Sequence, residues 1–381
     1  MSAKINSFNQ ENGRINRVIF LIPSLGGGGA EKTASILIPV LAREFFLKTV
    51  LLSNEQVHKL PQGLEVVAIS PRTNSSLRHI LRIPLQVSRL ARMVRRLQID
   101  SVLSFMEQAN IINVLASGFT GHRCFLSQRT NPLKQYEYKG LLGKLIMVAS
   151  SRTYKRADKI ICVSEEICTI LAHTYGIDPC RLCFIPNPID TSPIKVESIA
   201  STKAPPPFIL QVGRLNIAAK GQDLTLHAFK NLLREVPRLN LVFAGDGPDA
   251  AKLREMAKRL GIMNKVFFMG WTSEPRALML RANMLVHPSR YEGWPNVLPE
   301  ALSCQCPVVA ADCRTGPREI LQNGKCGLLV PPDNPEALTK AMLKIYRNGD
   351  LQERLKSAGL ARARDFMPEK IGKRYAKVLK G

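Results

Sequence analysis

Acidic and aromatic residues are both scarce in this chain of 381 residues. It contains 30 Asp and Glu against 54 Lys and Arg, a formal net charge of +24, and aromatic residues make up 6% of it. So positive a chain is expected to meet an anionic partner, such as a nucleic acid, an acidic membrane, a lipid-linked phosphate or a nucleotide-sugar. Few aromatics, no zinc-finger spacing and no evident helix-turn-helix argue against the nucleic acid.

Long apolar segments are also missing. No run of 18 uninterrupted apolar residues occurs, and the first 17 residues lack the apolar core of a signal peptide, so we expect a cytoplasmic protein. The nine cysteines lie mostly in apolar contexts, which predicts reduced, buried thiols. Cys180 and Cys183 have C-x-x-C spacing, but without a second pair or nearby histidines a structural zinc is disfavoured.

Apolar runs alternate with helical spacing along most of the chain. Residues 17–25 form an apolar run that ends in Gly26–Gly29 and precedes a helical pattern, which indicates strand, glycine turn and helix. Such alternation predicts an α/β fold with parallel sheets covered on both faces. We predict a Rossmann-like domain at 15–190, a Pro-rich linker at 191–207, a second Rossmann-like domain at 208–365, and a helix at 366–381 that packs back on the first domain.

The strongest chemical signal is the segment 289–312, where Glu292 and Glu300 are separated by seven residues. Glu300 falls near the start of a predicted helix, and Glu292 lies in the preceding loop. Unpaired N–H groups at a helix start favour a phosphate, and a nearby carboxylate accepts hydrogen bonds from sugar hydroxyls. Spacing alone equally allows a Glu300 that offsets the helix dipole and a solvated Glu292.

Arg214 and Lys220 follow a strand end and precede a helix. Two preorganised cations could stabilise a departing nucleoside diphosphate without a metal, and no Asp-x-Asp pair suited to Mg²⁺ occurs. Taken singly, each is more often a surface charge. Gly28 and Gly29, after the first strand, could let the backbone approach a ligand or could simply form a tight turn.

Five segments occur in an order that resembles a known family. They are GGGAEK (27–32), GRLNIAAKG (213–221), AGDGP (244–248), YEGWPNVLPEAL (291–302) and TGPREIL (315–321). Together they are similar to the GT-B retaining glycosyltransferases of family 4, over nearly the whole chain. The resemblance implies two Rossmann-like, doubly wound domains facing a central cleft, and metal-independent transfer from a nucleotide-diphosphate sugar.

The resemblance also assigns residues. Catalytic roles fall to Arg214, Lys220 and Glu292, with the two cations on the diphosphate. Gly28 and Gly29 would bring backbone to the donor from the first domain. The remaining donor-binding residues would be Gly270, Trp271, Gly293, Trp294, Pro295, Asn296, Val297 and Glu300. No cofactor or metal is expected, and UDP is the carrier expected from its frequency in the family.

One loop differs from many relatives, which carry a donor-contacting histidine in the first domain. Here LSQRTNP (126–132) occurs instead and resembles a loop of a subset acting on bacterial surface glycans. Ser127, Arg129 and Asn131 could bind acceptor or donor, or Asn131 could stabilise the loop before Pro132. Pro299 is also unusual, but a first helical turn tolerates it.

Positive charge is concentrated in the first half. Seven arginines and no acid lie between Val66 and Ile99, within a pattern that predicts a basic amphipathic helix kinked at Pro84. A second basic tract extends from Lys134 to Lys159. We expect this surface to attract anionic lipid and a lipid-linked or glycan acceptor at the inner face of the membrane. Alternatively, the arginines only keep one helix face soluble.

The sequence therefore predicts transfer of a hexose or N-acetylhexosamine to a membrane-associated glycan or lipid-linked acceptor. Two other functions remain open. One is nucleic-acid binding through the basic first half, and the other is a GT-B-fold epimerase or phosphorylase.

Overall fold

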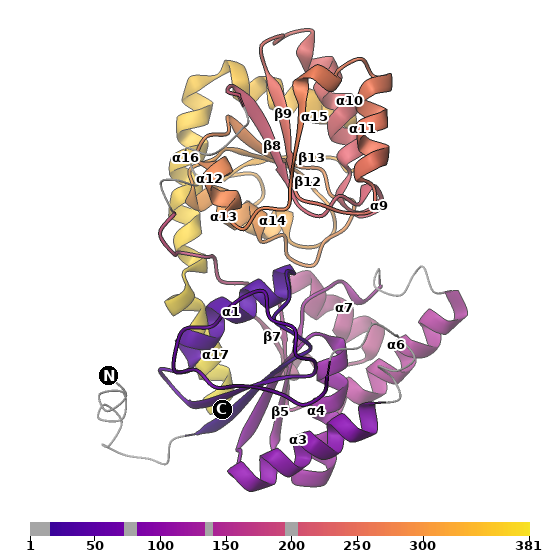
Figure 1. The fold of residues 1–381 in the computed structure, drawn as a ribbon, viewed down its shortest axis with the longest axis vertical. Coiled ribbons are helices and arrows are strands. Elements are labelled where there is room, and N and C mark those ends of the chain that lie inside the picture. The colour runs from indigo at the N-terminus through magenta and orange to yellow at the C-terminus, as the bar shows by residue number, and fades with distance from the viewer. Residues whose placement is uncertain (1–15, 72–81, 134–139, 195–204) are drawn as a thin grey trace. The chain divides into compact units, whose positions relative to one another are not determined.

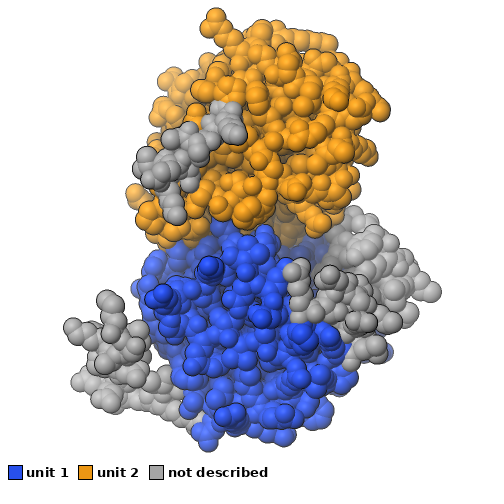
Figure 2. Space-filling model, in the orientation of Figure 1, with its two compact units in different colours: residues 1–188, 368–381 blue, residues 189–367 orange. Residues whose placement is uncertain are grey.

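The computed structural model describes residues 16–71, 82–133, 140–194 and 205–381 and divides the chain into two compact units. Unit 1 comprises residues 1–188 and 368–381, and unit 2 comprises residues 189–367 (Figure 2). Because each unit has its own sheet and its own core, each is described by itself.

Unit 1 is built on a seven-stranded parallel sheet of order β3-β2-β1-β4-β5-β6-β7. Its central strands are almost fully buried, as expected for a parallel sheet covered on both faces. The strands are β1 (Arg17–Ile22), β2 (Phe46–Leu51), β3 (Val66–Ala68), β4 (Ser101–Phe105), β5 (Arg123–Gln128), β6 (Lys159–Cys162) and β7 (Leu182–Phe184).

Helices cover both faces of this sheet (Figure 1). One core layer lies under α1 and α17, and another under α3 and α4. The helices of unit 1 are α1 (Gly29–Leu41), α3 (Ile83–Leu97), α4 (Glu107–Thr120), α6 (Gly140–Tyr154), α7 (Glu165–Tyr175) and α17 (Pro368–Lys380), with the short 3-10 helix η1 (Pro179–Arg181). The C-terminal helix α17 thus belongs to unit 1, although 179 residues of unit 2 separate it from the rest.

Unit 2 repeats the plan with a six-stranded parallel sheet of order β10-β9-β8-β11-β12-β13. Its strands are β8 (Phe208–Val212), β9 (Asn240–Ala244), β10 (Val266–Gly270), β11 (Met284–His287), β12 (Val308–Ala311) and β13 (Leu328–Val330). Its helices are α9 (Ile217–Lys220), α10 (Gln222–Leu233), α11 (Ala250–Arg259), α12 (Pro275–Met279), α13 (Val297–Ser303), α14 (Pro317–Ile320), α15 (Pro335–Arg347) and α16 (Gly349–Ala363), with the 3-10 helices η2 (Met263–Lys265) and η3 (Arg364–Phe366).

Both sheets are doubly wound, and the strand order reverses beside the first strand of each. In unit 1 the reversal lies between β1 and β4, and in unit 2 it lies between β8 and β11. Loops leaving the carboxyl ends of such neighbours diverge and open a crevice, which is where ligands bind in open α/β sheets. The fold therefore predicts ligand sites at the loops that follow β8 and β11 in unit 2, and β1 and β4 in unit 1.

The predicted α/β class of two Rossmann-like domains is confirmed. The predicted kink at Pro84 is wrong, because Pro84 lies in the first turn of α3, where a proline removes no helical hydrogen bond.

Part of that basic segment, residues 72–81, lies outside the described residues, as do 134–139 of the second tract and 195–204 of the predicted linker. No helix in the described parts of the chain has the length and apolarity needed to cross a bilayer.

Gly221 joins α9 to α10 and has a φ of +63°. A Cβ there would lie 2.2 Å from the Pro288 carbonyl oxygen in the loop after β11. We predict that Gly221→Ala lowers the free energy of unfolding of unit 2 by about 2 kcal/mol or more, since a left-handed conformation and a backbone clash are both imposed. Denaturant titration followed by circular dichroism measures this.

The matched control is Gly349→Ala in the same unit. An added Cβ at Gly349 meets no atom within 4 Å, and this glycine starts α16, so stability should stay the same or rise. Equal destabilisation by the two substitutions would show that Gly221 is not a point of close approach.

Candidate functional site

The segment after β8 carries the two predicted cations of unit 2. Gly213 has a φ of +148°, and the exposed Arg214 follows it directly. The short helix α9 (Ile217–Lys220) follows and is capped by Asn216, whose side chain accepts a hydrogen bond of 3.0 Å from the Ala219 N–H. Arg214 and Lys220 therefore flank one turn at the carboxyl edge of the sheet.

Lys220 is paired with the loop that follows β11. Its Nζ lies 2.6 Å from Glu292 Oε1, and His287 Nε2 lies 2.9 Å from the same oxygen. His287 is the last residue of β11, so the strand, the loop and α9 meet at this carboxylate. Lys220 and Glu292 thus meet beside the two strands between which the strand order reverses.

The Glu292 carboxyl group is ionised despite its burial. Burial alone would raise its pKa, but the Lys220 ammonium and His287 outweigh that effect and hold the pKa well below its usual range. The interaction therefore stabilises the fold at neutral pH and is lost only as the pH falls below the ordinary carboxyl range toward the lowered value. Glu292 can act as a permanent acceptor for hydroxyl donors.

Arg290 fixes the same loop to the helix that carries Lys220. Its guanidinium donates to both oxygens of Asp223 at 3.0 and 2.8 Å and to the Ile217 carbonyl at 2.7 Å. The Arg290 N–H also donates to the Ala219 carbonyl at 2.9 Å. Planar, bidentate pairing of this kind sets geometry as well as energy. Arg290 thereby holds α9 and the β11 loop in register.

The loop from Gly293 to Asn296 is packed from behind by the segment 314–317. Gly316 has a φ of +95°, and a Cβ there would lie 2.6 Å from Pro295 Cδ. The Thr315 hydroxyl donates to the Glu292 carbonyl, and the Trp294 ring packs edge-on against Phe366 at 5.7 Å. The Trp294 ring is therefore used in packing, and contact of this loop with a donor stays a prediction.

The start of α13 completes this edge. Val297 begins the helix after Asn296, and Glu300 lies in its first turn and is buried. Pro299 also falls in the first turn, as predicted for a tolerated proline. Glu300 therefore lies at the helix start, where the sequence placed it.

Gly270 and Trp271 lie at the end of β10, the edge strand of the sheet. Gly270 has a φ of +71°, its carbonyl accepts a hydrogen bond of 2.8 Å from the Gly245 N–H, and Trp271 is 60% exposed. They share the carboxyl edge with the Lys220 site but lie two strands from β8. Contact of Gly270 and Trp271 with a donor stays a prediction.

In unit 1, the glycine turn leads directly into α1. Gly28 caps the helix and Gly29 begins it, and a Cβ at Gly28 would lie 2.3 Å from a Glu31 carboxyl oxygen. Burial raises the pKa of Glu31 in the first turn of this helix. Only the flexible Glu31 side chain would have to shift to admit a side chain at Gly28, so packing does not require glycine there, and contact of Gly28 and Gly29 with a donor stays a prediction.

The loop after β5 turns its side chains inward. The buried Arg129 donates to Asn187 Oδ1 at 2.5 Å and to Ser127 Oγ at 3.4 Å, and lies 4.4 Å over the Phe105 ring. Asn131 accepts from the Leu133 N–H at 3.0 Å, which is the local stabilisation considered for this loop. In this arrangement the three side chains form hydrogen bonds within unit 1, and their binding of acceptor or donor stays a prediction.

Two family models account for most of the chain. The model of Glycosyltransferase Family 4 matches residues 27–193, and that of Glycosyl transferases group 1 matches residues 195–362. The chain belongs to the family 4-type GT-B glycosyltransferases.

Relatives of this glycosyltransferase act in glycan assembly, by their names. The N-acetylgalactosamine-N,N'-diacetylbacillosaminyl-diphospho-undecaprenol 4-alpha-N-acetylgalactosaminyltransferase of Campylobacter jejuni is 28% identical over 94% of this chain and 98% of its own. The lipopolysaccharide 1,6-galactosyltransferase of Salmonella typhimurium is 31% identical over 41% of this chain and 44% of its own. Anabaena Alr3699/HepE in complex with UDP has the same fold, with a TM-score of 0.78 at 22% identity over 96% of this chain and 99% of its own.

Three residues of the glycosyltransferase site escaped sequence reasoning. His287, Arg290 and Thr315 all hold the Glu292 loop. His287 could have been found from the sequence, because it is a polar residue at the end of a buried strand. Arg290 has no such signal, because its partners Asp223 and Asp333 are distant in sequence. Within the described residues, no group of three or more His, Cys, Asp or Glu is arranged to hold a metal ion.

We predict that Lys220 and Glu292 are strongly coupled in stability. Lys220→Met leaves a buried carboxylate with His287 alone and should cost about 1–3 kcal/mol, less than for a fully buried pair because the lysine is 26% exposed. Adding Glu292→Gln removes the buried charge, so the double variant should lose less than the sum. A double-mutant cycle measured by urea unfolding tests this.

The exposed pair Arg259–Glu255 on α11 serves as the reference cycle. Its coupling should be about 0.5 kcal/mol, as for surface i,i+4 pairs. A Lys220–Glu292 coupling no larger than this value would contradict the geometry described above.

Proposed function

We propose that this glycosyltransferase is retaining and moves a hexose or N-acetylhexosamine from a nucleotide-diphosphate sugar, with UDP as carrier, to a lipid-linked or membrane-associated glycan. The alternatives from the sequence, nucleic-acid binding and epimerase or phosphorylase chemistry, have no comparable support. The relatives' names and the UDP in a structural neighbour point to sugar transfer.

The observation that carries the proposal is the arrangement at the carboxyl edge of unit 2. Arg214 is exposed, Lys220 is partly exposed, and both follow β8 directly beside the strand reversal. Negative charge grows on a nucleoside diphosphate as its bond to the sugar breaks. Two cations placed beside the leaving oxygens would stabilise that charge.

The Glu292 carboxylate supplies the complementary function. It is anionic, buried and adjacent to Lys220. It can therefore accept hydrogen bonds from the hydroxyls of the donor sugar while Lys220 binds the phosphates. Glu300 in α13 would accept from the ribose. Metal independence is part of the proposal, because the two cations provide the charge that a divalent ion would supply. The α-linkage in the Campylobacter relative's name supports retention, as expected of an α-linked donor.

We predict that donor binding needs the cations and not a metal. UDP-sugars should raise the melting temperature of the protein more than GDP- or ADP-sugars do, equally with and without EDTA. Arg214→Ala and Lys220→Ala should each slow transfer by about 100-fold, the effect of losing one transition-state donor. Radiolabelled-donor transfer with product analysis measures the rates and separates transfer from epimerisation or phosphorolysis.

Lys258→Ala is the matched control, since Lys258 is an exposed lysine on α11 of the same unit. It should transfer sugar at the wild-type rate. Loss of activity on EDTA addition, or full activity of Arg214→Ala, would contradict the mechanism.

We also propose that unit 1 attaches to anionic membranes through the α3–α4 surface, defined by Arg92, Arg95, Arg96, Leu115 and Phe119. The arginines are exposed on α3, and Phe119 is 67% exposed at the end of α4 with Leu115 one turn earlier on the same face. Arg95 donates to the Phe119 carbonyl at 2.7 Å, so a cation lies beside the apolar tip. Apolar side chains flanked by cations suit the boundary of an anionic bilayer.

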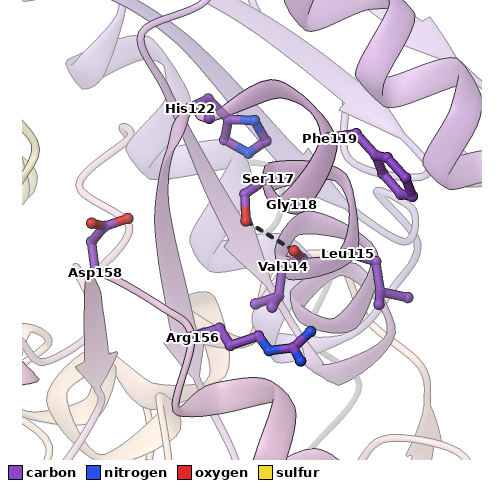
Figure 3. A pocket seen from close by; sticks show the side chains of 9 residues that line it. Val114, Leu115, Ser117, Gly118, Phe119, His122, Arg156 and Asp158 are labelled. Carbon is purple, nitrogen blue, oxygen red and sulfur yellow. Dashed lines mark hydrogen bonds between the residues drawn. The ribbon is translucent and has the colours of Figure 1, made fainter.

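A cavity of about 430 Å³ adjoins this surface at the end of α4 (Figure 3). Leu115, Phe119 and His122 line it together with Arg156 and Asp158. Burial lowers the pKa of His122 to about 4, so the imidazole is neutral at physiological pH and positive charge comes from the arginine. The cavity thus holds one cation, Arg156, and one carboxylate, Asp158, beside apolar side chains.

We predict that Phe119→Ser weakens binding to vesicles with 30% anionic lipid by about 10-fold, as expected from losing one partly buried aromatic side chain. Flotation measures the bound fraction. Val57→Ser, which removes another half-exposed apolar side chain of unit 1, should bind as the wild type does. Equal recovery of wild-type protein with neutral and anionic vesicles would refute the attachment, and strong salt-dependent DNA binding without nucleotide-sugar binding would favour the nucleic-acid alternative.

A further inference from the structure

We propose that His287 is a positioning residue that retains Glu292 when Lys220 turns toward the donor diphosphate. This rests on the proposed function of the site in unit 2. His287 itself touches no donor. Its role is to make the lysine available while the carboxylate stays in place.

The three side chains are graded in depth. His287 is 3% exposed, Glu292 8% and Lys220 26%, so the histidine lies innermost and the lysine nearest to solvent. Both nitrogen donors contact the same oxygen, Glu292 Oε1. An incoming anion therefore meets the ammonium first and can draw it from Glu292 without disturbing the histidine beneath.

Without a second partner, the carboxylate would oppose this movement. A buried carboxylate that loses its only partner pays a large desolvation penalty, so a lysine serving alone would be held in place. The His287 hydrogen bond of 2.9 Å leaves Glu292 with a donor after Lys220 departs. The cost of releasing the lysine falls, and donor affinity rises by that amount.

The fold keeps the histidine fixed. His287 ends β11, whose four residues are buried and paired with β8 on one side and β12 on the other. The main chain of Glu292 is also held in place, because the Thr315 hydroxyl donates to the main-chain carbonyl of Glu292. Nothing in this arrangement needs to move except the lysine side chain, which is the least buried member.

Two polar substitutions of different length test the proposal. His287→Gln places an amide nitrogen near the position of Nε2, whereas His287→Asn ends about one bond short of it. We expect the Gln variant to keep donor KM and UDP affinity within about 3-fold of the wild type. The Asn variant should lose about 10-fold in both, with a smaller change in kcat. Steady-state kinetics and titration calorimetry with UDP measure these values.

The same pair is then made in a Lys220→Met background. If the histidine acts by releasing Lys220, His287→Asn should cause no further loss of UDP affinity there. A merely structural role predicts the same loss with or without the lysine. Melting temperatures show whether a variant has lost UDP affinity because it is unfolded. If His287→Asn is unfolded, His287→Gln is compared in the wild-type and Lys220→Met backgrounds instead, and these two UDP affinities test the proposal.

The outcomes separate the two proposals. Failure of the wild-type protein to bind any nucleotide or nucleotide-sugar would overturn the proposed function. Normal wild-type binding with equal behaviour of the Gln and Asn variants, or equal losses in both backgrounds, would overturn the role of His287 and leave the proposed function intact.

Discussion

The contact between Lys220 and Glu292 is the constraint on which the unit 2 site depends. A buried carboxylate is tolerated only when donors surround it, and here an ammonium and an imidazole share one oxygen. Because the donors come from α9 and β11, the pair also decides how closely the two loops approach. Gly221 allows that approach because it has no side chain. A Cβ there would lie 2.2 Å from the Pro288 carbonyl oxygen.

The sheet topology explains why this contact forms at this place. Strand order reverses between β8 and β11, so the chain leaves two neighbouring strands in opposite directions and the loops must part. At this edge Arg214 is exposed and Lys220 is partly exposed, whereas the strands themselves are buried. Arg290 then ties the parted loops together through Asp223 and the Ile217 carbonyl. Arg290 therefore stabilises the fold of unit 2 and also holds the two loops that carry Lys220 and Glu292.

Much of this fold was predictable because strand runs and helical spacing are local signals. The apolar run predicted at 17–25 contains β1 (Arg17–Ile22), and the alternation of apolar runs with helical spacing predicted the two parallel sheets seen in the described residues. Arg214, Lys220 and Glu292 were also identified, from spacing and resemblance. His287 and Arg290 were not, because their roles depend on contacts that form only when separate loops meet.

The excess of positive charge serves several purposes, which composition alone could not separate. Arg129, Arg276 and Arg290 are structural, since each donates to carbonyl or amide oxygens that join separate segments. The α3 arginines are exposed and lie in unit 1, whereas Arg214 and Lys220 lie at the carboxyl edge of unit 2. A structural arginine is already satisfied by its own chain, so it contributes little attraction to an outside anion. The exposed α3 arginines in unit 1 and the exposed Arg214 in unit 2 are therefore where a negatively charged substrate or surface gains most.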